Sequence, residues 1–173
     1  MANKLMIVAH PDDEVIFGGA HLLQQEDWKV ICVTNGNRER RANEFLTVMD
    51  TVGAECEIWS FRDTYSTHFD REGLKESLAQ ELAKATYKRV VTHGFKGEYG
   101  HPQHRAIARI VDALVQDHLY MFSRGDKKLA PEVIEQKWEL ISLYRSQRHT
   151  IRDLRHDDDL DAYIEREAFV RIK

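Results

Sequence analysis

The sequence predicts an α/β fold, a Rossmann-like three-layer sandwich with helices on both faces of a mostly parallel central sheet. Two observations predict it. Short apolar runs alternate with longer helical patterns along the chain, and such crossovers place successive strands parallel to one another. The length of 173 residues, with only three prolines and nine glycines, leaves no room for a flexible linker. We therefore expect a single domain over residues 1–173.

The N-terminal half shows this alternation most clearly. KLMIVA (4–9) is an apolar run without alternation, which is typical of a strand covered on both faces. A helix with apolar residues at near-helical spacing follows over 13–25. WKVICVTN (28–35) repeats the strand pattern, 39–52 predicts a second helix, and AECEIWSF (54–61) predicts a third strand.

The C-terminal half continues in the same order. After a polar connection we expect a helix over 72–87, a strand at RVVTHG (89–94), a helix over 102–117 and a fifth strand at HLYMFS (118–123). The remainder predicts helices around 132–145 and 160–168, with a charged stretch between them.

Composition excludes several classes of partner. A net charge of −4 and a pI near 6.1 argue against a general nucleic-acid binder, because such proteins usually carry a basic excess. No apolar run reaches the ~18 residues of a membrane span, and the N-terminus lacks a signal-peptide pattern. Cys32 and Cys56 lie in apolar strand-like runs, as reduced buried thiols do. We expect a cytoplasmic protein with neither nucleic-acid nor membrane partner, and the oligomeric state stays open.

Three consecutive carboxylates follow the first predicted strand in VAHPDDEV. His10 closes the strand, Pro11 favours a tight exit, and Asp12 to Glu14 open the helix. One interpretation is that Asp12 or Asp13 caps the helix, because a carboxylate accepts the free N–H groups there. A cap accounts for one acid only. A divalent cation offsets the repulsion among three, and imidazole with carboxylate is a usual ligand set for zinc or iron.

A second constellation is GEYGHPQH, in which His101 and His104 stand three residues apart at a predicted helix start. Both can project toward one side of the first turn. Taken alone, the pair is equally typical of one capping histidine and one incidental neighbour. Both motifs, however, fall at the carboxyl ends of predicted strands, where parallel sheets bind ligands. Together they predict a metal site.

These segments resemble the PIG-L/LmbE-like family of zinc-dependent de-N-acetylases, which remove acetyl groups from N-acetylglucosamine-containing substrates. The similarity extends to RRANEFLTVMDTVGAE (40–55), FRD (61–63) and KWELISLYRSQ (137–147) and so covers most of the chain. The resemblance implies the α/β fold described above and a small N-acetylated molecule as substrate.

The resemblance also implies roles for individual residues. The implied metal ligands are His10, Asp13 and His104, for Zn²⁺ or another divalent transition metal such as Fe²⁺. The other implied roles are general base for Asp12, acid or oxyanion-stabilising group for His101, carbonyl polarisation for Tyr99, and substrate contacts for Arg41 and Asp63. These roles are chemically consistent, because three protein ligands leave an open position for water, whose proton a neighbouring carboxylate can take.

One residue departs from the family pattern. Gln103 stands where the usual H-P-D-H motif has an acid, and a neutral amide supplies no charge to hold His101 protonated. We expect a metal-dependent hydrolase that removes an N-acetyl group from an N-acetylglucosamine-type sugar or conjugate. Two alternatives remain: a deacylase of a modified nucleotide, amino acid or secondary metabolite, and a metal-containing binding module without turnover.

Two further stretches contain candidate residues. His93 ends the fourth predicted strand; a supporting contact behind the metal ligands or a substrate contact competes there with a plain strand-end histidine, which we favour. HDDDLD (156–161) follows no apolar strand, so we interpret it as a solvated loop and helix start.

Overall fold

A computed structural model describes residues 2–66, 68–157 and 160–173, and its described part contains a six-stranded sheet of order β3-β2-β1-β4-β5-β6. The strands are β1 (Lys4–Val8), β2 (Trp28–Thr34), β3 (Glu55–Phe61), β4 (Arg89–Thr92), β5 (Leu119–Arg124) and β6 (Glu167–Arg171). The first five run parallel, and β6 pairs antiparallel with β5. The predicted α/β class with a mostly parallel sheet is confirmed.

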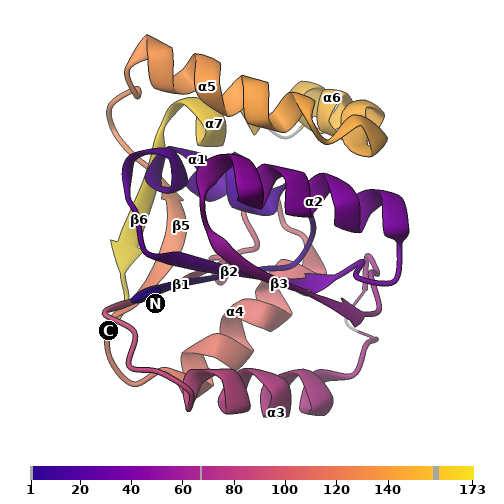
Figure 1. Cartoon of the computed structure of the whole chain (residues 1–173), viewed down its shortest axis with the longest axis vertical. Coiled ribbons are helices and arrows are strands. Elements are labelled where there is room, and N and C mark those ends of the chain that lie inside the picture. Colours follow the sequence, from indigo (N-terminus) through magenta and orange to yellow (C-terminus); the bar gives the residue numbers. More distant parts are fainter. Residues whose placement is uncertain (1, 67, 158–159) are drawn as a thin grey trace.

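Helices cover both faces of this sheet (Figure 1). On one face lie α3 (Arg71–Leu82) and α4 (Pro102–Leu114); on the other lie α1 (Asp13–Gln24), α2 (Glu39–Val52), α5 (Pro131–Ser142), α6 (Arg148–Asp157) and α7 (Leu160–Glu165). A short 3₁₀ helix, η1 (Arg145–Gln147), connects α5 to α6. Among the described residues no helix is long and apolar enough to cross a bilayer.

Strand β1 lies at the centre and has two buried faces. Met6 and Val8 point into the core beneath α1, whereas Leu5 and Ile7 point into the core beneath α3 and α4. All four are fully buried, which explains an apolar run without alternation. Burial of each such side chain contributes about 1.5–3 kcal/mol. The carboxyl end of β1 is therefore a rigid platform for the residues that follow it.

The C-terminal segment differs from the prediction. The charged stretch before residue 158 forms α6, and the helix expected over 160–168 ends at Glu165, before β6. The apolar signal in α6 is weak because basic residues surround the buried Ile151. Strand β6 is a short edge strand that carries a buried acid, Glu167, so its pattern does not indicate a strand. Residues 158 and 159 of HDDDLD lie outside the described residues.

Candidate metal centre

The turn after β1 directs its carboxylates away from the start of α1. Asp12 is the residue before α1 and has φ 118°, a conformation that non-glycine residues rarely adopt, and its side chain makes no capping hydrogen bond. Asp13 Oδ2 instead accepts the backbone N–H of His10 at 2.8 Å. The capping interpretation therefore holds for neither acid, and both side chains are available to the site.

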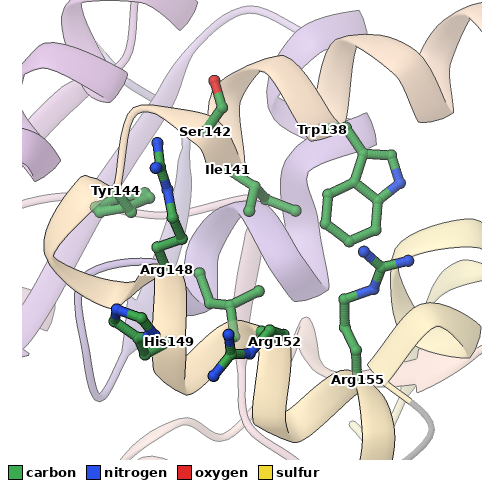
Figure 2. A pocket seen from close by; sticks show the side chains of 9 residues that line it. Trp138, Ile141, Ser142, Tyr144, Arg148, His149, Arg152 and Arg155 are labelled. Atoms are coloured by element: carbon green, nitrogen blue, oxygen red, sulfur yellow. The ribbon is translucent and has the colours of Figure 1, made fainter.

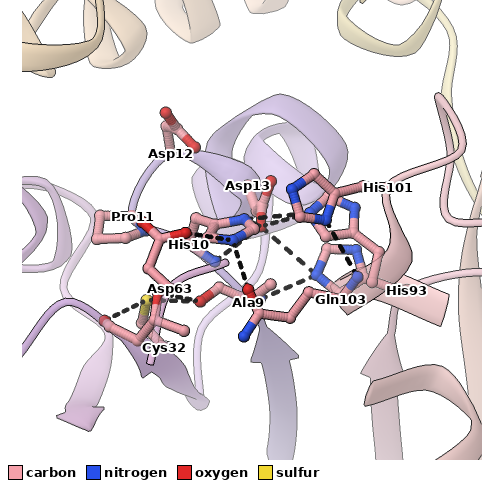
Figure 3. A network of polar contacts seen from close by, with 12 residues as sticks. Ala9, His10, Pro11, Asp12, Asp13, Cys32, Asp63, His93, His101 and Gln103 are labelled. Atoms are coloured by element: carbon pink, nitrogen blue, oxygen red, sulfur yellow. Dashed lines mark hydrogen bonds and ion pairs between the residues drawn. The ribbon is translucent and has the colours of Figure 1, made fainter. Parts of the chain in front are cut away.

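Three buried atoms that can bind a metal ion converge at this turn. His10 Nδ1 lies 3.2 Å from Asp13 Oδ2, His104 Nε2 lies 3.3 Å from the same oxygen, and the two ring nitrogens are 3.2 Å apart. Ligands at about 2.0–2.1 Å from a tetrahedral zinc stand roughly 3.3–3.4 Å from one another. His10 is 7% exposed, Asp13 2% and His104 0%. The spacing, chemistry and burial of this set fit a divalent cation (Figure 3).

Glu98 orients the histidines behind the cluster. Its Oε2 accepts from His104 Nδ1 at 2.7 Å and from His93 Nδ1 at 2.9 Å, while Oε1 accepts the N–H of Gly94 at 2.7 Å. Burial raises the pKa of Glu98, but His93 and His104 outweigh it and lower the pKa to about 2. Glu98 therefore holds a proton on His104 Nδ1 and leaves Nε2, which faces Asp13, as the nitrogen that can bind a cation.

His93 is positioned by hydrogen bonds on both ring nitrogens. Its Nε2 accepts the N–H of Ala9 at 2.9 Å, and its Nδ1 donates to Glu98. Although Nε2 lies 3.5 Å from Asp13 Oδ2, its lone pair is already used. His93 thus supports the site and stacks on His104 at 3.8 Å between ring centroids. The interpretation of His93 as a plain strand-end histidine is therefore too narrow, because this residue packs against a candidate metal ligand.

His101 is the residue before α4 and lines the pocket. Its Nδ1 accepts the backbone N–H of Gln103 at 3.2 Å, so the capping interpretation applies to this histidine. Burial and the neighbouring His104 and His10 lower the pKa of His101 to about 3. The ring is therefore neutral near pH 7 and its Nε2–H is a donor.

The side chain of Gln103 does not act on His101, contrary to the expectation from sequence. Its Oε1 lies 3.0 Å from His10 Nε2, and only its backbone N–H contacts His101. The Gln103 side chain instead lies among His10, which follows β1, and Arg62 and Thr64, which follow β3.

Asp12 and Tyr99 complete the chemistry of the pocket. Burial, with the charge of Asp13, raises the pKa of Asp12 above its usual range. Burial also raises the pKa of Tyr99, with Asp13 and Asp12 adding to the effect, so the hydroxyl stays protonated and remains a donor. A carboxylate that can exchange a proton and a hydroxyl that stays protonated near pH 7 thus line the same pocket.

Arg41 and Asp63 line the same pocket as a pair. Arg41 Nη1 donates to Asp63 Oδ2 at 3.3 Å, and Nη2 donates to the carbonyl of Pro11 at 3.0 Å. Asp63 Oδ1 also lies 3.4 Å from His10 Nε2. The pocket has a volume of about 320 Å³. The predicted residues that line it are His10, Asp12, Asp13, Arg41, Asp63, Tyr99 and His101, and His104 lies behind them.

Comparison with known proteins decides the family. A family model described as PIG-L: GlcNAc-PI de-N-acetylase matches residues 5–115, more than half of the chain. The chain belongs to the PIG-L family. The family resemblance inferred from the motifs is thereby confirmed.

Two relatives of this PIG-L protein extend the comparison. It is 35% identical over 168 residues to the uncharacterized protein L374 of Acanthamoeba polyphaga mimivirus, covering 87% of this chain and 74% of that protein. It is 24% identical over 132 residues to the N-acetylglucosaminyl-phosphatidylinositol de-N-acetylase of Saccharomyces cerevisiae, covering 65% of this chain and 43% of the yeast enzyme. The chain thus spans less than half the length of the yeast relative.

Solved structures share the fold of this PIG-L protein. An N,N'-diacetylchitobiose deacetylase from Pyrococcus horikoshii superposes with a TM-score of 0.68 at 16% identity, covering 98% of this chain and 83% of that one. GalB, a 4-carboxy-2-hydroxymuconate hydratase from Pseudomonas putida, superposes with a TM-score of 0.64 at 21% identity, covering 94% of this chain and 83% of GalB. At these identities the likeness shows the fold alone, which serves more than one reaction.

A second pocket of this PIG-L protein lies between α5 and α6 (Figure 2). Its volume is about 360 Å³, and Trp138 and Ile141 face Arg148, Arg152 and Arg155 across it. The Arg155 guanidinium lies 4.4 Å from the centre of the Trp138 ring. None of the residues that line it is a carboxylate or a thiol. A lining with one histidine and no carboxylate offers no ligand set for a cation, so the pocket beside His10 is the candidate reaction site.

Proposed function

We propose that this PIG-L protein is a metal-dependent hydrolase that removes the N-acetyl group from an N-acetylglucosamine-type sugar or sugar conjugate. The observation that carries the proposal is the set of three buried donor atoms, 3.2–3.3 Å apart, beside the pocket-lining carboxylate of Asp12. The family description and the printed name of the yeast relative support a glucosamine conjugate as substrate. The cytoplasmic location inferred from sequence stays a prediction.

In this proposal His10 Nδ1, Asp13 Oδ2 and His104 Nε2 hold the cation. Two imidazoles and one carboxylate suit Zn²⁺ or Fe²⁺. When bound, the cation supplies Lewis acidity at the scissile carbonyl and a water whose pKa is near 7. The rest of the chemistry falls to side chains around it.

Asp12 acts as the general base in this scheme. It takes one proton as water oxygen bonds to the amide carbon, and the same proton passes to the nitrogen as the C–N bond breaks. The products are the free amine and acetic acid, which ionises to acetate and releases the second proton of the water to solvent. Its raised pKa suits both transfers, because a group that titrates nearer to neutral pH can accept and return a proton.

His101 and Tyr99 stabilise the developing oxyanion. Neutral His101 has its ring proton on Nε2, and Tyr99 keeps its hydroxyl proton, so each offers one donor. The lowered pKa of His101 favours this role over that of proton donor to the amine. Arg41 and Asp63 are paired on the pocket wall. In this proposal they bind hydroxyl groups of the substrate.

An amine-release assay tests the proposal. Zinc-loaded protein is incubated with N-acetylglucosamine glycosides, nucleotide sugars, N-acetyl amino acids and acetylated nucleosides, and free amine is measured. Amine is expected from at least one sugar compound and is lost in Asp12→Asn. Release from the non-sugar compounds only would favour the alternative deacylase. No release from any compound, despite bound metal, would contradict the hydrolase and favour a binding module.

A further inference from the structure

Gln103 is a buried polar side chain that the proposed mechanism does not use. It is 0% exposed, and Figure 3 shows its side chain beside His10. We propose that Gln103 is a positioning residue, whose side-chain oxygen fixes His10 in the tautomer that presents Nδ1 to the metal. This inference rests on the metal site of the proposed function.

Two backbone groups fix the orientation of the Gln103 amide. Its Nε2 donates to the carbonyl of Arg62 at 2.8 Å, and its Oε1 accepts the N–H of Thr64 at 3.3 Å. A carbonyl only accepts and a backbone N–H only donates. In the reversed amide, the NH₂ group would face the N–H of Thr64 and the oxygen would face the carbonyl of Arg62. The oxygen must therefore be the atom that faces His10.

The orientation of the amide decides where the His10 proton lies. Gln103 Oε1 is only an acceptor, so His10 Nε2, 3.0 Å away, carries the hydrogen. Asp63 Oδ1, 3.4 Å from the same nitrogen, is an acceptor as well and favours the same tautomer. An imidazole that binds a cation is neutral and has one N–H, so the His10 lone pair available to an ion is on Nδ1, 3.2 Å from Asp13 Oδ2.

The two histidines of the cluster are thus oriented by different chemistry. Glu98, a carboxylate, holds His104 through Nδ1, whereas an amide holds His10 through Nε2. The amide directs the ring without adding a negative charge beside Asp13 and Asp63. A bound ion would therefore meet Nδ1 of His10 and Nε2 of His104.

Paired substitutions separate positioning from simple structural support. Gln103→Leu removes the acceptor, whereas Gln103→Glu keeps an oxygen toward His10, and both lose the hydrogen bond to Arg62. Positioning predicts that Gln103→Leu weakens zinc binding about 10–100-fold and that Gln103→Glu stays within a few-fold of wild type. A structural role predicts an equal loss in both. The zinc Kd is measured on the full chain by competition with a chromophoric chelator, with urea unfolding of each protein in parallel.

Nitrogen-15 spectra of the zinc-loaded, histidine-labelled protein supply a second readout. Wild type is expected to show one imidazole bound through Nδ1 with a proton on Nε2, and Gln103→Leu is expected to lose that signal. If Gln103→Leu fails to fold, Gln103→Met of similar length repeats the test. Wild type without bound zinc would contradict the metal site itself. Zinc-binding wild type with equal affinity and spectrum in Gln103→Leu, or equal weakening in both variants, would overturn only the positioning role.

Discussion

Replacing Glu98 by glutamine is expected to weaken metal binding by disturbing His104. The carboxylate accepts three N–H groups: Nδ1 of His104, Nδ1 of His93 and the backbone N–H of Gly94, at 2.7, 2.9 and 2.7 Å. Glutamine has one acceptor oxygen and one NH₂ group in the same shape. Whichever way the amide turns, at least one of the three donors faces another donor.

The size of the effect follows from this loss. A hydrogen bond to a charged group contributes about 1.5–3 kcal/mol, so losing one costs about 2 kcal/mol. For a chain of 173 residues, a change of this size lowers Tm by roughly 4–8 °C. The loss of a partner that orients a metal ligand costs about 10–100-fold in metal affinity, which corresponds to roughly 1.4–2.8 kcal/mol.

The assay compares Glu98→Gln with wild type and with Glu135→Gln, a control at an exposed position on α5. The zinc Kd is measured by chelator competition and the Tm of each metal-free protein by circular dichroism. We expect a raised Kd for Glu98→Gln alone. A zinc Kd within twofold of wild type would refute the argument that Glu98 orients His104.

Three further predictions concern the base and the buried ion pair. Asp12→Asn should keep its bound metal while amine release falls about 10²–10⁴-fold; metal analysis with the amine assay checks this, and loss of metal would contradict it. Lys137→Met removes the ammonium group that pairs with the buried Glu167, which keeps only its contacts with His21 and Ala20, and should cost about 3–5 kcal/mol in urea unfolding; a loss below about 1 kcal/mol would contradict it. Burial raises the pKa of Glu167, but Lys137 and His21 outweigh it and hold the pKa below 4.5. This contribution to stability is therefore present above about pH 4.5 and declines as the pH falls through the lower folded-state pKa. Wild type should lose more stability on acidification than Glu167→Gln, and parallel curves would contradict the reasoning.

The parallel part of the fold could be predicted because burial on two faces leaves a clear pattern. β1 and β2 are apolar runs without alternation, since helices cover both sides. The C-terminal elements gave no such signal. Helix α6 buries Ile151 among arginines, and β6 buries Glu167, whose partner Lys137 lies thirty residues earlier on α5. Tertiary contacts stabilise these elements, and no local pattern encodes them.

The candidate metal ligands could be predicted because they lie in two recognisable motifs. The residues that orient those ligands could not, because their roles depend on contacts made only in the folded chain. VAHPDDEV and GEYGHPQH lie at the ends of neighbouring strands, so the sheet brings His10 next to His104. The roles of Glu98 and His93 depend on which ring nitrogen faces which partner. Gln103 contacts His10 from 93 positions away, and the sequence alone suggested its near neighbour instead.

Metal content is the most direct test of the proposed centre. Wild type, Asp13→Ala and the control Asp50→Ala, at an exposed position on α2, are loaded with zinc, freed of unbound metal and analysed per mole of folded chain. We expect about one ion in wild type and in the control, and almost none in Asp13→Ala. An absence of zinc from wild type, or an undiminished content in folded Asp13→Ala, would contradict a metal site at His10, Asp13 and His104.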